Sequence, residues 1–515
     1  MCLSNCKFTK YPLIDGSTYI ENETTCFGSR FTKHLIRGNC NNVVFTHQNC
    51  VCNERLAFKY RHQTTGTMRT NNIDYSFVNL HPIIHRKVIE NMNHIMDHYQ
   101  PQLESFYNII MSYHGRLRNK YIHARHILYT EGIQPKHYVN KCFIKDDKYH
   151  LKVFNSDQSV PKAPRAIQYQ SGAATLYKAQ FIIPIEKHFY SYLDHHGLRV
   201  FTKGMNNHDV AQLMVDSINS INDPVAIEND FSSFDASVCV NLLKLFHKFV
   251  IKHVPSNYRK RVKKALRYDL KVIGYTSKGD HYTTIGTITS GSIDTSFKGN
   301  FVNYYATVCI LEFCNIQKHQ YKLICNGDDS VLYIARECVN KFKYHMYELF
   351  GLNAKTKVIS NPYDAEFCQG KIVSIDNGYC LVRDPERIFT RLGWVVGNKG
   401  RKGFDYVKTV LMCEMANNYG VPLIYPYLRQ LYLKCPGIVN LNLLDTYKQE
   451  LYRGHSFWKY DNPNIYISRN SIFSILAVYP DLPYYLSTSP STFMSKPDHS
   501  RDKQNYSLLL ATYGI

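Results

Sequence analysis

The feature that most constrains the fold of this chain is an apolar hairpin with two adjacent carboxylates at its tip. An apolar run at residues 323–325 leads into Asn-Gly-Asp-Asp, and a second apolar run begins at Val331. Asn-Gly is a favoured hairpin turn, so the pattern predicts two antiparallel strands that meet at Asp328 and Asp329. Taken alone, these four residues are better explained as a plain surface turn than as a metal site.

A second acidic strand end strengthens the functional interpretation. Residues 225–227 are predicted to form a short apolar strand that stops at Glu-Asn-Asp230. From Leu242 onward, apolar residues recur at the spacing of a helix. Removing a carboxylate from water costs several kcal/mol unless it is paired or binds a cation. Oxygen ligands select magnesium or manganese over zinc. Asp230, Asp328 and Asp329 are therefore candidate ligands for the two ions of in-line phosphoryl transfer.

The segments between these motifs predict a mixed fold of the α+β class. Residues 271–288 are rich in Thr, Tyr, Val and Ile around Ser-Lys-Gly-Asp, which predicts another hairpin. A helical stretch begins after Gly291, and residues 85–130 and 342–352 also look helical.

The charge balance indicates a partner that carries phosphate. The 515 residues include 62 Lys and Arg against 41 Asp and Glu, which gives a net charge of +21. A hydrophobic content of 44% excludes a disordered chain, and the length excludes a small disulfide-stapled protein. Nucleic acid is the leading partner, while an anionic membrane and simple solubility are the alternatives.

Two basic runs precede the acidic motifs. The first lies in the helical region and comprises His114, Arg116, Arg118, Lys120, Arg125 and His126. The second flanks a stretch that is predicted to be a loop and comprises Lys141, Lys145, Lys148, Lys152, Lys162 and Arg165. Each run alone is explained by a solvated face. Their position before the acidic motifs favours phosphate binding.

The cysteines give no disulfide framework. Six of the 16 fall within the first 70 residues, without a paired C-x2-C pattern, so we expect reduced structural thiols rather than a zinc site. No secretory signal is expected, and no run reaches the ~18 apolar residues that a membrane span needs.

Taken in order, these motifs resemble the palm of viral RNA-dependent RNA polymerases. The first palm motif matches Asp-Phe-Ser-Ser-Phe-Asp at residues 230–235, the second Ser290-Gly291, Thr295 and Asn300, and the third Gly327-Asp328-Asp329. Further matches narrow the resemblance to tombusvirus-like positive-strand RNA viruses: Ala-Pro-Arg-Ala-Ile-Gln at 163–168, Phe-Cys-Gln at 367–369, Val-Arg-Asp-Pro at 382–385 and Tyr-His-Gly-Arg at 113–116.

The resemblance implies RNA synthesis on an RNA template from ribonucleoside triphosphates, with two magnesium ions that manganese can replace. It assigns metal binding to Asp230 and Asp328, with Asp329 as a weaker ligand. Nucleotide binding falls to Lys145, Lys162, Arg165, Asp235, Ser290, Thr295 and Asn300, and RNA binding to Arg116, Arg118, Lys120, Gly291, Cys368 and Gln369. Lys355 or Lys357 is the candidate general acid, and a surface lysine is the alternative for either.

The implied architecture is a right hand with an antiparallel palm sheet flanked by helices and a mainly helical thumb. Its expected parts are an amino-terminal extension at 1–75 packed on fingers or thumb, fingers at 76–223 and 254–284, palm at 224–253 and 285–371, and thumb and carboxyl-terminal region at 372–515. The implied partners are the RNA template and product and a membrane-anchored viral replication protein, at membrane-associated replication complexes in the host cytoplasm.

Two rival functions are a reverse transcriptase and an RNA-binding protein with an inactive palm. Reverse transcriptases commonly have an aromatic residue where this chain has Asn326, and the intact aspartates argue against an inactive palm. One departure from the family pattern stands out. The family places Asn four residues after Thr295, where this chain has Gly299, and Asn300 comes one residue later. One helical residue is about 100° of rotation, so either a local bulge returns Asn300 to the ribose or that contact is lost. We expect the bulge, because glycine at position 299 readily accommodates an irregular turn.

Overall fold

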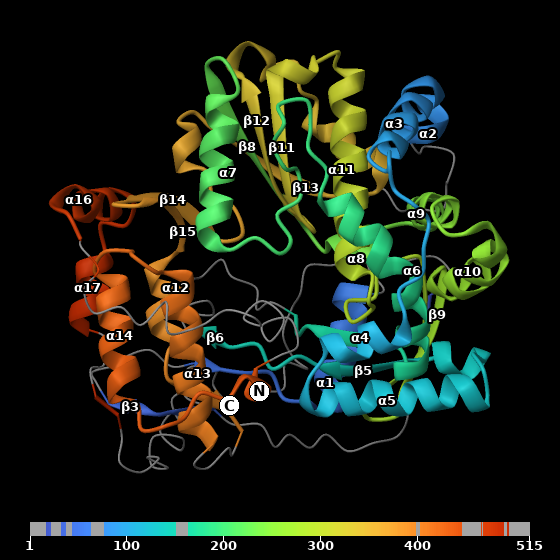
Figure 1. The fold of residues 1–515 in the computed structure, drawn as a ribbon, viewed down its shortest axis with the longest axis horizontal. Helices are drawn as coiled ribbons and strands as arrows, with labels where there is room; N and C mark the ends of the chain where they lie inside the picture. The colour runs from blue at the N-terminus through green and yellow to red at the C-terminus, as the bar shows by residue number, and fades with distance from the viewer. Residues whose placement is uncertain are drawn as a thin grey trace.

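The computed structural model describes residues 17–21, 32–37, 44–62, 77–150, 163–397, 402–444, 465, 467–488 and 492–493. Its central feature is a four-stranded antiparallel sheet in the order β11-β12-β8-β13, in the upper part of Figure 1. The strands are β8 (Pro224–Phe231), β11 (Tyr321–Asn326), β12 (Asp329–Ala335) and β13 (Ala354–Ile359). The predicted acidic hairpin and the strand before Asp230 are confirmed.

Helices pack on both sides of this sheet, which explains why β11 and β12 read as continuous apolar runs. In Figure 1, α7 and α11 stand on either side of the strands. The surrounding helices are α2 (Phe77–Leu80), α3 (Pro82–His94), α6 (Gly172–Tyr190), α7 (Asn207–Asn219), α8 (Phe234–Ser237), α9 (Val240–Lys252) and α11 (Thr295–Phe313). Sheet and helices share one large apolar core.

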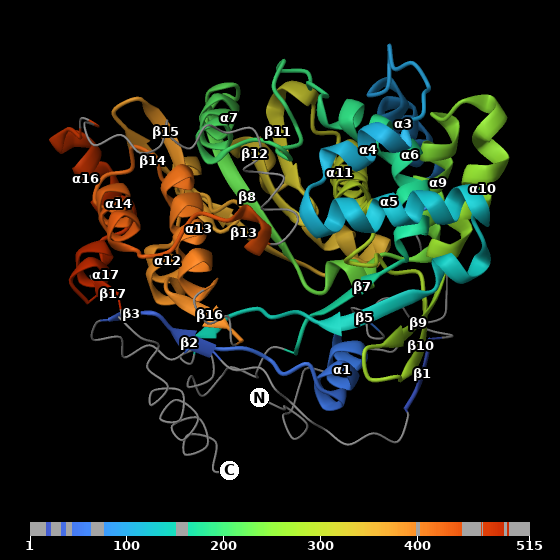
Figure 2. The same cartoon turned by 60° about the horizontal axis from the view of Figure 1, so that its bottom comes forward.

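A second sheet of five strands lies below the first and is clearest in Figure 2, in the order β1-β10-β9-β5-β7. Its strands are β1 (Thr18–Ile20), β5 (Asn140–Ile144), β7 (Ala166–Tyr169), β9 (Lys271–Thr276) and β10 (His281–Ile285). The pair β5 and β9 is parallel and the others are antiparallel. The helices near it are α1 (Val51–Ala57), α4 (Phe106–Ser112), α5 (Gly115–Thr130) and α10 (Arg259–Leu266).

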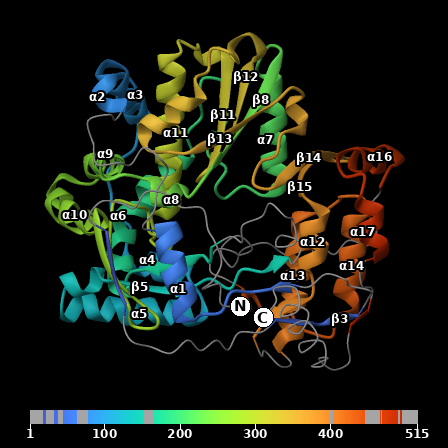
Figure 3. The ribbon, with the colours of Figure 1, turned by 180° about the vertical axis from the view of Figure 1, so that it is seen from behind.

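The carboxyl-terminal region is mainly helical and has a core of its own. It contains the hairpin β14 (Gly370–Ile375) and β15 (Gly378–Arg383) and the helices α12 (Pro385–Arg391), α13 (Lys402–Asn417), α14 (Ile424–Lys434), α16 (Arg469–Val478) and α17 (Leu482–Thr488). Figure 3 shows this region beside the sheets, from behind.

The amino-terminal strands reach both of the lower regions of the molecule. While β1 joins the five-stranded sheet, β2 (Thr32–His34) pairs with β16 (Trp394–Val396) and β3 (Ile36–Arg37) with β17 (Thr492–Phe493). In addition, β4 (Val44–Phe45) pairs with β6 (Tyr149–His150). Short turns of 3-10 or π-helix complete the fold at Phe58–His62, Pro135–Tyr138, Ser256–Tyr258, Arg267–Asp269, Lys318–Gln320, Arg336–Cys338, Tyr344–Phe350, Pro362–Asp364 and Leu441–Leu443.

Most sequence-based expectations for local structure are confirmed, with one correction. The helical region at 85–130 comprises α3, α4 and α5, and residues 271–288 form the hairpin β9-β10. The helix expected over 342–352 is wrong: only Tyr344–Phe350 is helical, and it forms a 3-10 turn of aromatic residues with modest helix propensity. Of the amino-terminal cysteines, Cys50 is buried and Cys52 half-buried, and the other four lie outside the described residues. No described helix has the length and apolarity to cross a bilayer.

Candidate active site

Three aspartates meet at one end of the four-stranded sheet. Register pairs Ser330 of β12 with Asn229 of β8, so Asp329 and Asp230 are the next neighbours along the two strands and share a face. Asp328 lies in the turn immediately before β12. The structure therefore brings together the three carboxylates that the sequence singles out, and all three are exposed.

The carboxylates of this cluster destabilise one another's charge. Desolvation by the surrounding protein, followed by the charges of Asp328 and Asp230, raises the pKa of Asp329 to about 6. Desolvation also raises the pKa of Asp328, and Asp230 adds to the effect. Burial and the charge of Asp328 raise the pKa of Asp235, in α8, to about 7, although Arg165 opposes this shift. Such a concentration of negative charge would be stabilised by a cation.

The three aspartates of this cluster suit Mg²⁺ better than a metal ion whose ligands are all protein side chains. Within the described part of the chain, no group of three or more His, Cys, Asp or Glu side chains could hold a metal ion by itself. Mg²⁺ typically keeps several waters and binds through one or two carboxylates plus substrate phosphates. Asp230 and Asp328, both exposed at one end of the sheet, provide two such carboxylates and leave the other coordination positions to water and substrate.

The raised pKa values predict how stability changes with pH. Because Asp329 is harder to ionise in the folded protein, its ionisation opposes folding as pH rises from its ordinary pKa near 4 through about 6. In metal-free buffer, Asp329→Asn should raise the midpoint of thermal unfolding by about 1 to 3 °C at about pH 8 and have little effect at about pH 4. Thermal melts of both proteins at the two pH values test this. A variant less stable than wild type at the higher pH would contradict it.

The loop that contains Ser290 and Gly291 is hydrogen-bonded to strand β7. The Ser290 hydroxyl donates to the carbonyl of Ala166 (3.1 Å) and accepts from the backbone N–H of Gln168 (3.4 Å). The N–H of Gly291 donates to the carbonyl of Gln168 (2.8 Å), and a Cβ at Gly291 would lie only 2.4 Å from that oxygen. The hydroxyl of Thr295 donates within the loop, to the carbonyl of Thr289 (2.7 Å). Glycine at position 291 is therefore required for this contact.

Two of the predicted nucleotide-binding residues, Lys145 and Arg165, lie next to strand β7. The backbone N–H of Lys145 donates to the carbonyl of Arg165 (2.8 Å), and both side chains approach Asp147, at 3.3 and 3.6 Å. The charge of Arg165 partly offsets the rise in the pKa of both Asp235 and Asp328, so this guanidinium acts on the carboxylate cluster. Lys162 lies outside the described residues.

The bulge expected at Asn300 is absent. Helix α11 runs without interruption from Thr295 to Phe313, so Asn300 is rotated away from the position that the family pattern assigns to it. The fully buried Asn300 side chain accepts from the backbone N–H of Gly327 (2.9 Å) and donates to the Tyr190 hydroxyl (3.2 Å). The Asn300 amide is thus hydrogen-bonded to the turn that carries Asp328.

Asn303, which the sequence analysis missed, completes this support. Its side-chain amide donates to the carbonyls of Gly327 (3.0 Å) and Asp328 (3.2 Å). Helix and turn approach so closely that a Cβ at Gly299 would lie 3.3 Å from the Cα of Gly327. The available signal was a pair of asparagines three residues apart in a helix rich in apolar residues, because amides that become buried there must find hydrogen-bond partners. We call Asn300 and Asn303 the asparagine clamp.

The Phe-Cys-Gln segment forms a tight turn against the same site. Cys368 and Gln369 both have positive φ, 49° and 67°, between the bonded ends Phe367 and Gly370. Burial and the nearby charge of Asp329 raise the pKa of the Cys368 thiol to about 12. Cys368 therefore lies beside the carboxylates in its protonated form.

Of the two candidate general acids, Lys355 is the nearer to the cluster. It stands directly opposite Asp230 on β13, whereas Lys357 stands opposite Glu228, further along the same face. Both side chains are exposed. The register therefore favours Lys355.

The predicted RNA-binding residues of α5 point in different directions. The Lys120 ammonium lies 5.5 Å from the centre of the Tyr169 ring, and desolvation together with Lys141 lowers its pKa. Lys120 lines a groove of roughly 870 Å³ between α5 and the five-stranded sheet. Arg116 is exposed, and Arg118 contacts Met111.

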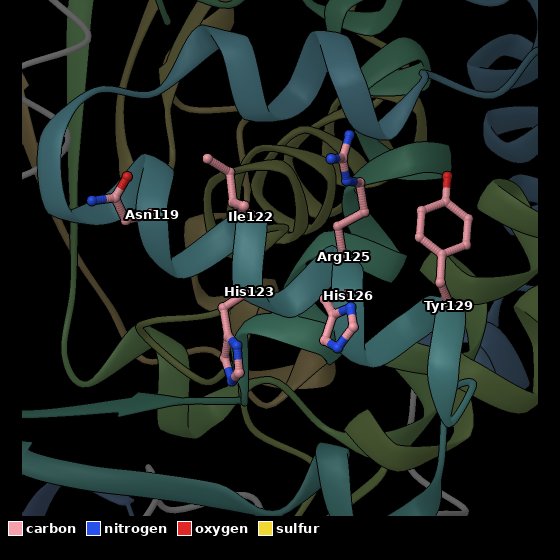
Figure 4. Close-up of a pocket in the computed structure, with 6 residues that line it drawn as sticks. All are labelled: Asn119, Ile122, His123, Arg125, His126 and Tyr129. Atoms are coloured by element: carbon pink, nitrogen blue, oxygen red, sulfur yellow. The ribbon is translucent and has the colours of Figure 1, made fainter.

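A shallower hollow of roughly 540 Å³ lies on α5 itself. Figure 4 shows its lining residues, with His123 and His126 pointing one way and Arg125 and Tyr129 the other. The remaining two are Asn119 and Ile122. His123 also lines the larger groove, so α5 presents basic and aromatic groups to both hollows.

A buried charge cluster, which the sequence analysis did not predict, lies next to the loop that precedes α11. The Lys298 ammonium contacts Asp269 (2.7 Å) and Asp294 (2.9 Å), and Lys178 also pairs with Asp269. Burial alone would raise the pKa of Asp269, but the two lysines hold it well below its ordinary value. Asp294 accepts from the hydroxyl of Ser292 (2.6 Å), so the cluster fixes the loop that precedes α11.

Comparison with known proteins agrees with this arrangement. A family model described as viral RNA dependent RNA polymerase matches residues 32–454. The RNA-directed RNA polymerase of carnation mottle virus is 29% identical over 350 residues, which cover 65% of this chain and 43% of the relative. The enzyme of the same name from tobacco necrosis virus (strain A) is 26% identical over 333 residues, 62% and 44% of the two chains. That from oat chlorotic stunt virus is 30% identical over 261 residues, 48% and 33%.

These relatives are longer proteins, and the chain spans less than half of the length of each. The family match nevertheless extends over most of the 515 residues and includes every element that carries the carboxylate cluster, the β7 attachment and the asparagine clamp. From its motifs, its geometry and this match, the chain belongs to the viral RNA-dependent RNA polymerase family.

Proposed function

We propose that this protein replicates a positive-strand viral RNA genome by adding ribonucleotides to an RNA strand under the direction of an RNA template. The observation that carries the proposal is the cluster of Asp230, Asp328 and Asp329, in which desolvation and neighbouring negative charge raise the pKa of Asp328 and Asp329. An arrangement of this kind is suited to a divalent cation and a polyphosphate, which together neutralise it.

The chain's own residues divide the work of nucleotidyl transfer. Asp230 and Asp328 would hold two Mg²⁺ ions, or Mn²⁺ in their place, with Asp329 as a weaker ligand. When bound, such ions favour the ionised 3′ hydroxyl and stabilise the departing pyrophosphate. Arg165 and Lys145 bind the triphosphate, and Arg165 does so through its planar fork of donors.

Three further groups orient the substrates. Asp235 accepts a hydrogen bond from the ribose 2′ hydroxyl, and Lys355 donates a proton to the leaving group. The segment Ser290 to Thr295, attached to β7, holds the template base opposite the incoming nucleotide. Lys120 and its neighbours on α5 bind the template backbone.

In this proposal the three structural regions are the parts of a right hand. The four-stranded sheet with α8, α9 and α11 is the palm, at 224–253 and 285–371. Strands β5, β7, β9 and β10 with α4, α5 and α10 belong to the fingers, at 76–223 and 254–284, and the helices after residue 371 form the thumb. A membrane-anchored replication protein as partner, and membrane-associated complexes in the host cytoplasm as location, complete the proposal.

Synthesis on a defined RNA template tests the function. Purified protein incubated with template, four ribonucleotides and magnesium should yield products of template length. RNA binding without any magnesium-dependent product would instead favour the alternative of an RNA-binding protein with an inactive palm.

Two charge reversals should separate nucleotide binding from template binding. Arg165→Glu should raise the nucleotide KM by roughly tenfold or more and leave template affinity nearly unchanged, because Arg165 lies at the carboxylate cluster. Lys120→Glu should weaken template binding and reduce the slope of log affinity against log salt by about 0.7 per lost phosphate contact. Steady-state kinetics and RNA titrations at several salt concentrations measure both effects. Equal effects of the two changes on both quantities would contradict the assignment.

A further inference from the structure

One face of the five-stranded sheet carries a row of exposed aromatic and basic side chains. Along β9 the residues alternate, so that Lys271, Ile273 and Tyr275 are exposed while Val272, Gly274 and Thr276 are buried. Ile273 is 52% exposed and Tyr275 is 42% exposed, which is unusual for large apolar and aromatic residues on a central strand. Among the described residues, none covers the side chains of Ile273 and Tyr275 on this face.

The row continues across neighbouring strands. Tyr275 pairs with His281 on β10 and with Lys141 on β5, and Lys141 pairs with Tyr169 on β7. The Tyr275 and His281 rings lie 4.2 Å apart. Tyr275, Lys141 and Tyr169 also line the 870 Å³ groove beside α5, together with Lys120. Aromatic faces and cations thus alternate from β10 into the groove.

At its other end β9 follows the basic helix α10 closely in the chain, because only the 3-10 turn Arg267–Asp269 and Leu270 separate them, and both lie on the right-hand side of Figure 1. Eight exposed cations gather on α10 and its flanks: Lys252, Arg259, Lys260, Arg261, Lys263, Lys264, Arg267 and Lys271. The one acidic residue within 252–271 is Asp269, which is buried against Lys178 and Lys298. Among the described residues, no carboxylate forms an ion pair with any of the eight.

We infer that the groove beside α5, the exposed face of β9 and the cations of α10 form one continuous binding track for single-stranded RNA, which we call the outer track. The inference rests on the proposed function and extends it, because the track holds template that has not yet reached the carboxylate cluster. Four residues of strand and eight of helix give a path of roughly 25 Å beyond the groove. Bases stack on Tyr169, Tyr275 and His281, and phosphates meet the lysines and arginines between and beyond them.

RNA fits this surface better than a membrane does. The apolar side of α10, formed by Val262, Ala265 and Leu266, is buried in the protein and offers nothing to a lipid interior. The aromatic groups instead lie in a groove and on a sheet face, where flat bases can stack. The unpaired cations are complementary to a phosphate backbone that runs across both.

Binding of fluorescent RNAs of two lengths tests the track without requiring synthesis. The triple variant Lys260→Glu, Lys263→Glu, Lys264→Glu should bind a single strand of about 30 nucleotides at least tenfold more weakly. One of about 8 nucleotides, which fills only the groove, should change less than twofold. For the long RNA the salt slope should fall by about 2, at about 0.7 per phosphate. Tyr275→Ala should lower the affinity for the long RNA by roughly fivefold or more.

A matched triple reversal at the exposed Lys318, Lys341 and Lys343, which lie outside the track, should change neither affinity beyond the effect of net charge. Unchanged affinity of the track variant for the long RNA, or an equal loss for both RNAs, would overturn the inference. Loss of binding to phosphatidylserine vesicles with RNA affinity intact would likewise overturn it and identify a membrane surface. Wild-type protein that shows the length dependence but never makes product would refute the polymerase proposal and leave the track standing.

Discussion

Asp328→Asn and Asp230→Asn should each lower the rate of templated RNA synthesis by on the order of 10³-fold, with RNA affinity nearly unchanged. Each change removes a negative charge that two metal ions and a polyphosphate require in order to be held in line. Folding should not suffer, because the cluster already opposes its own ionisation: the pKa of Asp328 is raised by desolvation and by Asp230. Single-turnover incorporation and RNA titration on the same preparations measure the two quantities.

A matched control is available in Asp481→Asn, which removes an exposed carboxylate from the carboxyl-terminal region. It should synthesise RNA at the wild-type rate. Full activity of either cluster variant would refute the assignment of the site. Loss of RNA binding in parallel with synthesis would show that the substitution acts through the fold.

The second large effect is expected at the asparagine clamp. Asn303→Leu removes the donors that hold the carbonyls of Gly327 and Asp328, at 3.0 and 3.2 Å, and leaves a side chain of similar size. A shift of the catalytic turn by a fraction of an ångström should lower kcat by roughly 100-fold while the nucleotide KM changes by less than about threefold. Steady-state kinetics separate the two parameters. A rise in KM with kcat intact would indicate that Asn303 serves substrate binding instead.

Sugar selectivity distinguishes the clamp from the ribose site. Because the amide of Asn300 is bonded to Gly327 and Tyr190, Asn300→Ala should lower kcat without changing the preference for ribonucleotides over deoxynucleotides. Asp235→Ala should reduce that preference, since Asp235 lies near Asp328 and Arg165 and no clamp bond involves it. Incorporation ratios for matched ribo- and deoxynucleotides decide the matter, and altered selectivity in the Asn300 variant would return it to the ribose.

The carboxylate cluster could be predicted from the sequence because its signals are local. Apolar strands that end in aspartate and an Asn-Gly turn specify β8 and the β11-β12 hairpin without reference to distant residues. The order of the strands in the sheet could not be predicted from such local signals. The pairing of β8 with both β12 and β13, which places Lys355 opposite Asp230, joins residues more than a hundred positions apart.

Buried polar partners were the least predictable part of the site. Lys178 and Lys298 occur in apolar helical sequence, where a lysine would be expected to reach the surface, yet both are fully buried against Asp269. The prediction that a bulge would place Asn300 at the ribose was wrong for a related reason. The family pattern supplied an expected contact with ribose, but the helix remained regular and the turn at Gly327 satisfied the amide instead.

Single-nucleotide addition on templates that differ only at the next base tests the central claim most directly. With magnesium present, the protein should add only the ribonucleotide complementary to that base, and Asp328→Asn should add it on the order of 10³-fold more slowly. Addition that ignores the template base, or addition at the same rate by wild type and Asp328→Asn, would contradict RNA-directed synthesis at the cluster of Asp230, Asp328 and Asp329.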